Sequence, residues 1–159
     1  MLSYLKFLLK STNEHGVHSP FVFNYLTKCL YTKPRLSKNK VEDILLKSIS
    51  YFGCKNLKIE DESLKRKIVE NHITELTFDT SPLDLVVLKD FKCEAILSMI
   101  ASGKVHNDTF FLVQHLRKNH LEWQKTILHP KITVSIDGFS LGIFFIRKEQ
   151  VKEHFTIRI

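Results

Sequence analysis

The chain has 159 residues, a length that suits one domain with a substantial core. Its apolar content of 43% and charged content of 26% are close to globular averages, which excludes global disorder. Three widely spaced cysteines form no Cys-x-x-Cys pair, which excludes a disulfide framework and a zinc knuckle. The formal net charge of +7 favours anionic partners, such as nucleic acid or acidic lipid, and a solvated lysine-rich face is the simpler interpretation.

The first third of the sequence is predicted to be helical. Apolar residues recur at helical spacing in Tyr4, Leu5, Leu8 and Leu9, with lysines on the other side, as in an amphipathic helix that docks on a domain or lies on a membrane. We expect docking, because the helix is short. It cannot span a bilayer and no small-residue cleavage site follows it, so a cytoplasmic protein without a transmembrane segment is the simplest expectation.

Two further helices are expected before the first strand. Ser19 can cap free amides and Pro20 suits the first helical position, which predicts a buried helix over residues 21–31. Pro34 interrupts this helix, and apolar residues at helical spacing within residues 41–49 indicate the next one.

From Asn56 onward, short strands alternate with helices. Continuous apolar runs are typical of strands covered on both faces, and the alternation predicts a parallel sheet with right-handed crossovers. Asp137 and Gly138 form a turn signal between two later apolar runs, which indicates an antiparallel hairpin. The expected strands are residues 56–59, 83–88, 109–113, 132–136 and 141–146, with a last extended segment at 154–159. Helices are expected over 91–101 and through Leu121, Trp123 and Ile127, which we expect to form the core face of that helix.

The predicted fold class is therefore α/β, a Rossmann-like, mostly parallel sheet closed by a C-terminal antiparallel hairpin, with N-terminal helices. We expect a single domain overall, in which a helical segment of residues 1–52 packs on an α/β core of residues 53–159.

The turn after the first strand lacks the glycines of a nucleotide-binding fold. Residues 56–59 run directly into Glu60, Asp61, Glu62 and Ser63. A backbone can press against a cofactor only where no Cβ intervenes, so this acidic run argues against the usual dinucleotide or adenosyl pocket.

Both ends of the chain resemble a known family. The segments 15–23, with the sequence HGVHSPFVF, and 129–159 are similar to the two termini of a group of class I S-adenosylmethionine-dependent methyltransferases from Bacteroidetes bacteria, and the run 147–158 is the most specific part. A parallel sheet finished by an antiparallel hairpin is also the topology of that family. Residues 51–60 and 83–90 resemble the approach to its first core strand and its fourth strand.

Three cofactor or active-site segments depart from the family pattern. The glycine-rich turn after Glu60 is replaced, residues 89–92 have lost the acidic and polar residues usual there, and residues 113–116 stand where relatives commonly carry an acidic pair. The interval between Glu60 and Leu83 is shorter than the about 30 residues of one βαβ unit. Members of the family have two more strands in this interval, and one of them carries the carboxylate that holds the cofactor ribose. By resemblance, at least one βαβ unit is therefore missing from this chain.

The resemblance thus implies a methyltransferase-like protein that has lost methyl transfer and acts as a binding or interaction protein. We expect no catalytic residues and no cofactor, with S-adenosylmethionine bound only if the family function is retained. Vestigial cofactor contacts are expected at Glu60 and Asp61. No metal site is expected, since the i, i+3 pair of His15 and His18 lacks further ligands nearby. Four residues are expected to shape the turn before the second helix. By resemblance, they would form a lid or line the old substrate cleft. They are His15, Gly16, His18 and Phe21.

Other functions stay open. One is an active methyltransferase with a rebuilt pocket completed by a second chain, because a truncated sheet exposes an edge that another subunit can cover. Another is a basic module that associates with nucleic acid or a membrane surface. In each case we expect an unidentified protein or nucleic-acid partner on the basic surface, or a homo-oligomer. Acid–base pairs such as His106 with Asp108, or His115 with His120, are expected by chance among eight histidines.

Overall fold

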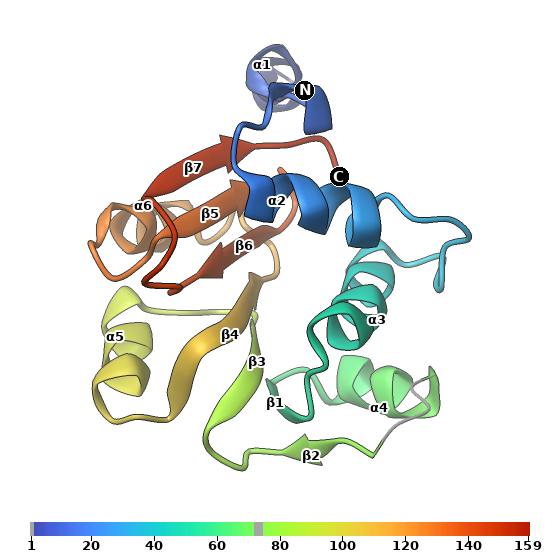
Figure 1. Cartoon of the computed structure of the whole chain (residues 1–159), viewed down its shortest axis with the longest axis vertical. Helices are drawn as coiled ribbons and strands as arrows, with labels where there is room; N and C mark the ends of the chain where they lie inside the picture. Colours follow the sequence, from blue (N-terminus) through green and yellow to red (C-terminus); the bar gives the residue numbers. More distant parts are fainter. Residues whose placement is uncertain (1, 72–74) are drawn as a thin grey trace.

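A computed structural model describes residues 2–71 and 75–159, and these form one mixed sheet with helices on both faces (Figure 1). The strands are β1 (Asn56–Ile59), β2 (Thr77–Phe78), β3 (Leu83–Leu88), β4 (Val105–Val113), β5 (Val134–Asp137), β6 (Gly142–Phe145) and β7 (Glu153–Thr156). They lie in the order β2-β1-β3-β4-β6-β5-β7. Strands β1 to β4 are parallel, β6 is antiparallel to both β4 and β5, and β7 is parallel to β5. The predicted α/β class and the C-terminal hairpin are confirmed.

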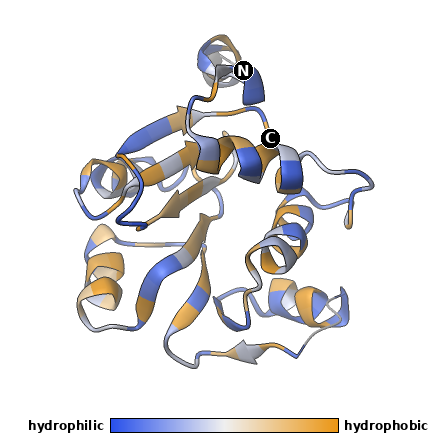
Figure 2. Cartoon of the chain, viewed as in Figure 1, coloured by the Kyte–Doolittle hydropathy of each residue, from blue (hydrophilic) through white to orange (hydrophobic). Residues whose placement is uncertain are grey.

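The helices cover the sheet in two groups. They are α1 (Leu2–Lys10), the short 3-10 helix η1 (Glu14–Gly16), α2 (Pro20–Tyr25) with the π-helical turn η2 (Leu26–Leu30), α3 (Lys40–Phe52), α4 (Glu62–Asn71), α5 (Cys93–Ala101) and α6 (His120–Leu128). Apolar side chains of α2, η2, α3 and α4 share one core with the sheet, whereas those of α5 and α6 share a second core. Successive strand residues alternate between the cores, as Leu85 and Val86 do. Because both faces are covered, the central strands β3 and β4 are mostly apolar, and their polar residues, Asp84 and residues 106–109, lie toward their amino ends (Figure 2).

Capping side chains fix where the helices begin and end. Ser19 accepts a hydrogen bond from the Val22 amide at 3.4 Å, and Pro20 opens α2 as predicted. At the start of α3, the Asn39 side chain accepts from the Val41 amide at 2.9 Å. Gly53 ends this helix in the left-handed region, with φ at +66°. The N-terminus of α3 lies beside the carboxyl ends of the strands, because Asn39 and Val41 line one hollow with Gln114, the residue that follows β4.

Helix α1 contacts the body through Tyr4, which the apolar pattern singled out and whose ring lies 4.8 Å from that of Phe139, and through Phe7, which the pattern did not single out. Phe7 is buried against Phe139 of the turn between β5 and β6, with ring centroids 5.2 Å apart. Leu5 and Leu9, expected on the docking face, are 54% and 87% exposed. Helix α1 therefore docks on the domain through its aromatic side chains rather than through its leucines. None of the helices in residues 2–71 and 75–159 combines the length and apolar character needed to cross a membrane.

The core face of α6 differs from the prediction at one position. Trp123 is fully buried and Ile127 packs against the same core, whereas Leu121 is 78% exposed. Residues two apart on a helix point about 200° apart, so Leu121 and Trp123 cannot share a face, and the prediction for Leu121 was wrong.

Candidate functional site

The carboxyl edge of the parallel strands is the expected ligand position in a sheet of this kind. The chain passes from β1 to β2 on one side and then to β3 on the other, so the strand order reverses between β1 and β3. Ligands of open α/β sheets bind in the crevice outside the carboxyl ends of the strands at such a reversal. The residues that follow the strands at this edge are Glu60, Lys89 and Gln114.

The two acidic residues after β1 are engaged in the fold itself. One carboxylate oxygen of Glu60 accepts a long hydrogen bond from the Lys89 amide, at 3.5 Å, and so links the ends of β1 and β3. Asp61 accepts from the Leu64 amide at 3.0 Å and so satisfies a free donor at the start of α4. The acidic run thus crosses the point of reversal and begins the next helix.

Strand β2 stops short of this edge. It pairs with β1 only at Asn56 and Leu57, and the amide of the following residue, Asp79, donates to the Leu57 carbonyl at 2.9 Å. Because β1 continues to Ile59, Asp79 lies level with the middle of its neighbour. The backbone of Asp79, the acidic residue that follows β2, is therefore set back from the level of Glu60 at the carboxyl edge.

A hollow of about 370 Å³ remains beside the edge, between the N-termini of α3 and α4 and the end of β4. Its lining residues are Asn39, Val41, Glu42, Asp61, Ser63, Leu64, Lys67, Gln114, His115 and Ser140. Lys67 pairs with Glu42 at 2.7 Å, and the Ser37 hydroxyl donates to the same carboxylate at 2.7 Å. These hydrogen bonds from Lys67 and Ser37 hold the pKa of the Glu42 carboxyl below its usual value. The charged groups of this hollow therefore largely satisfy one another.

The turn after β4 is constrained, which sequence reasoning did not anticipate. His115 has φ at +50°, an uncommon conformation for a residue with a Cβ. The turn is held by the Gln114 amide, which donates to Leu88, and by the Leu116 amide, which donates to Ser140. Gln114 is buried, and its side-chain oxygen has no hydrogen-bond partner within the described chain. His115 and His120, a pairing expected by chance from the sequence, share no hydrogen bond in the described residues.

The four residues assigned to a lid or cleft have separate positions. His15 and His18 are exposed, and His15 lies 3.5 Å from Glu14. A Cβ on Gly16 would overlap the side chain of Thr12, so glycine is required by packing. Phe21 packs edge-on against Phe145, with centroids 4.9 Å apart. None of the four lines the hollow at the carboxyl edge, and their role as a lid stays a prediction.

Two of the three buried cysteines are poor nucleophiles. All three thiols are free and buried, as expected for small apolar residues. Burial raises the pKa of Cys29 and of Cys54 to about 12. A thiol must be deprotonated to attack, so neither suits covalent catalysis.

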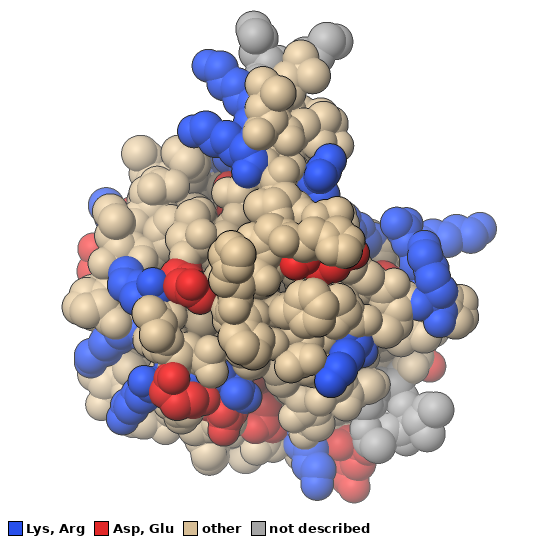
Figure 3. Space-filling model, turned by 45° about the horizontal axis from the view of Figure 1, so that its top comes forward, with Lys and Arg blue, Asp and Glu red and all other residues tan. Residues whose placement is uncertain are grey.

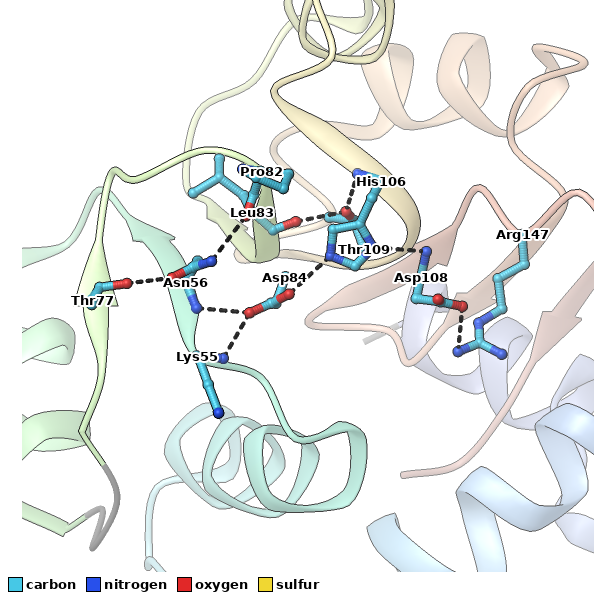
Figure 4. Close-up of polar contacts among 10 residues, drawn as sticks. All are labelled: Lys55, Asn56, Thr77, Pro82, Leu83, Asp84, His106, Asp108, Thr109 and Arg147. Carbon is cyan, nitrogen blue, oxygen red and sulfur yellow. Dashed lines mark hydrogen bonds and ion pairs between the residues drawn. The ribbon is translucent and has the colours of Figure 1, made fainter.

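A polar network occupies the opposite, amino edge of the sheet (Figure 4). Asp84 accepts from the amides of Lys55 and Asn56, both at 2.7 Å, and its other oxygen lies 2.8 Å from His106 Nε2. The second ring nitrogen of His106 accepts from the Asp108 amide at 3.2 Å. The Asp108 carboxylate pairs instead with Arg147 at 2.9 Å. Both ring nitrogens are therefore engaged, and the network links strands rather than leaving a free base.

Asp84 should be the residue of this network that matters most for stability. Burial alone raises the pKa of its carboxyl, but the amides of Asn56 and Lys55 and the His106 ring together outweigh burial and lower it. The stabilisation is present above the ordinary pKa of about 3.9 and is lost as the pH falls through the lower folded-state pKa. We expect Asp84→Ala to lower the free energy of unfolding by about 1–3 kcal/mol at neutral pH.

Urea denaturation at neutral pH and at about pH 3 measures this effect, and the difference between Asp84→Ala and the wild type should narrow at the lower pH. Asp90→Ala is the matched control, since Asp90 is exposed just beyond the other end of β3. An equal loss in both variants, or a loss independent of pH, would contradict the role given to Asp84.

Comparisons with known proteins add no family to this picture: no family model, no curated protein and no solved structure matches the chain. The fold, the occupied carboxyl edge and the surface charge are therefore the observations from which a function is argued.

Proposed function

We propose that this chain is a class I methyltransferase-like protein that has lost methyl transfer and acts as a binding protein in the cytoplasm. The observation that carries the proposal is the use of Glu60 and Asp61 within the fold. Glu60 links β1 to β3 and Asp61 caps α4, at the position where a nucleoside cofactor needs bare backbone.

The residues at this edge do not fit S-adenosylmethionine. Its ammonium and sulfonium groups would tolerate the negative charge of Glu60 and Asp61, so charge is not the obstacle. The obstacles are steric and geometric, because each of these residues adds a Cβ and a side chain, and because β2 ends level with the middle of β1. The carboxylate that follows β2, that of Asp79, would start from a backbone position set back from the ribose, and the adenosyl group would lack close backbone contacts.

The surface supports a binding role with an anionic partner. In Figure 3, lysine and arginine side chains project around the helix at the top and along the upper right edge of the molecule. With a net charge of +7, such a surface raises the encounter rate with nucleic acid or with an acidic protein face. The partner is proposed to be a protein or a nucleic acid met through this surface.

The second candidate is an active methyltransferase with a rebuilt pocket. The hollow of about 370 Å³ and the unpartnered Gln114 oxygen beside it favour this candidate, because the volume lies within the range of small-molecule sites. The short strand β2 forms an edge of the sheet that a second copy could extend. Light scattering that shows a monomer would remove its main support.

Isothermal titration with S-adenosylmethionine and S-adenosylhomocysteine tests the proposal. We expect no saturable heat at millimolar ligand, because the adenosyl and ribose contacts are missing. Micromolar affinity would overturn the loss of cofactor binding. If heat appears, repeating the titration with Gln114→Ala shows whether the hollow at the carboxyl edge is the site.

A further inference from the structure

We propose that a second hollow, on the other side of the start of α3, binds a phosphate group. This inference rests on the proposed binding function and names the chemistry of the partner. The hollow has a volume of about 250 Å³ and lies between the loop 31–39, the first turns of α3 and the end of the chain. Its lining residues are Leu30, Tyr31, Thr32, Lys33, Arg35, Lys40, Asp43, Ile44, Lys47 and Ile159.

The lining is strongly cationic once its internal ion pair is set aside. Lys47 is buried and lies 2.9 Å from the Asp43 carboxylate, and it also donates to the Thr32 carbonyl at 2.9 Å. That pair is neutral as a unit. The remaining charged side chains of the lining are those of Lys33, Arg35 and Lys40, and none of the three forms an ion pair with any described residue.

Lys33, Arg35 and Lys40 are exposed residues that line one hollow. Burial and the neighbouring Arg35 guanidinium together lower the pKa of the Lys40 amine. Like charges that face one hollow repel, and a bound anion would relieve that repulsion.

Helix α3 adds a favourable field to the hollow. The hollow runs along the first two turns of this 13-residue helix, from Lys40 to Lys47, so it begins at the positive end of the helix dipole. Asn39 already satisfies the amides of Val41 and Glu42, so the helix contributes chiefly its field rather than free donors.

The loop that carries the cations is tethered at both ends. After Lys33 and Arg35 in the sequence, the Leu36 amide donates a hydrogen bond to the Asp43 carboxylate at 2.6 Å, which ties this part of the loop to the buried ion pair. Before Lys33 and Arg35, the Tyr31 hydroxyl donates a hydrogen bond to the Arg158 carbonyl at 2.8 Å. The loop backbone is thus held in place, so binding does not have to pay the entropy cost of ordering it.

The hollow is large enough for the phosphate group of a ligand but too small to enclose a whole ligand of drug size. A volume of about 250 Å³ falls below the range of about 300–1,000 Å³ that is typical of sites enclosing a drug-sized ligand. Lysine and arginine are the side chains that recognise phosphate oxygens, arginine through two parallel hydrogen bonds. The phosphate could belong to a phosphorylated metabolite or to a nucleic-acid backbone, and the two sources are separated by experiment.

The test is isothermal titration of the full chain with pyrophosphate at low salt, alongside fluorescence polarisation with a labelled oligothymidylate. In the Arg35→Ala/Lys40→Ala variant, we expect the affinity for the phosphate ligand to fall by roughly tenfold or more, equivalent to about 1.4 kcal/mol. Lys38→Ala is the matched control, because Lys38 is exposed in the same loop but does not line the hollow. Its affinity should stay within about twofold of the wild type.

Each outcome bears on the proposal. Pyrophosphate binding that depends on the hollow supports a phosphorylated metabolite, and tighter oligothymidylate binding with the same dependence supports a nucleic-acid backbone. Failure of both ligands to bind, or equal losses in Lys38→Ala and Arg35→Ala/Lys40→Ala, would overturn it. Thermal denaturation of the free variants checks folding, and the double variant should be at least as stable as the wild type because repulsion is removed.

Failure of this site is distinguishable from failure of the proposed function. S-adenosylmethionine binding, tested with Gln114→Ala, concerns the carboxyl edge beside β4, whereas phosphate binding concerns Arg35 and Lys40. The result at one site can therefore overturn one conclusion without affecting the other.

Discussion

Replacing Asp43 by alanine is expected to lower the free energy of unfolding by about 3–5 kcal/mol. The side chains of Asp43 and Lys47 are 9% and 6% exposed, and they lie 2.9 Å apart. Removing the carboxylate leaves a buried ammonium without its counter-ion, and it also removes the acceptor for the Leu36 amide. Urea denaturation measures the loss.

A double-mutant cycle separates the ion pair from the other contacts. Asp43→Ala combined with Lys47→Met should recover part of the stability lost in Asp43→Ala, because the uncompensated charge is gone. Recovery should be incomplete, since the carbonyls of Leu30 and Thr32 lose the donor that Lys47 supplies. If the free energy of unfolding of Asp43→Ala lies within about 1 kcal/mol of that of the wild type, the ion pair is not buried as described.

Truncating Trp123 to alanine is the second change with a large expected effect, about 3–5 kcal/mol. Trp123 is fully buried beneath the hairpin, and a Cβ on Gly142 would approach its ring to 2.6 Å. The indole thus fills space that only a glycine leaves open. Its ring nitrogen has no hydrogen-bond partner in the described chain, so the loss should reflect cavity formation.

Leu121→Ala on the same helix is the matched control. Leu121 is 78% exposed, so its truncation should change the free energy of unfolding by no more than about 0.5 kcal/mol. Comparable losses for Leu121→Ala and Trp123→Ala, measured by thermal or urea denaturation, would contradict the orientation of α6.

Local patterns were enough to predict most of the fold. The apolar runs at 83–88 and 109–113 and the turn at Asp137 and Gly138 depend on neighbouring residues only, so the sequence indicates them directly. Strand β2 was not predicted, because two residues carry no periodicity, and its pairing with Asn56 and Leu57 is set by tertiary contacts.

The candidate sites were predicted less completely. Missing glycines after Glu60 indicated a changed cofactor turn, but the bonds that Glu60 and Asp61 make depend on where Lys89 and α4 lie. The contact between Asp84 and His106 crosses two strands whose register shifts near Leu83, which no local pattern encodes. The basic groups of loop 31–39 were visible as charge, whereas their arrangement around a hollow required the packing of that loop on α3.

Amide-resolved NMR titration with S-adenosylhomocysteine tests the central claim most directly. The claim is that Glu60 and Asp61 keep the carboxyl edge engaged in the fold, so the amides of Lys89 and Leu64, which donate to them, serve as reporters. We predict that neither amide shifts at millimolar ligand. Saturable shifts at Lys89, Leu64 and Gln114 would contradict the account, because they would place a nucleoside cofactor at the end of β1.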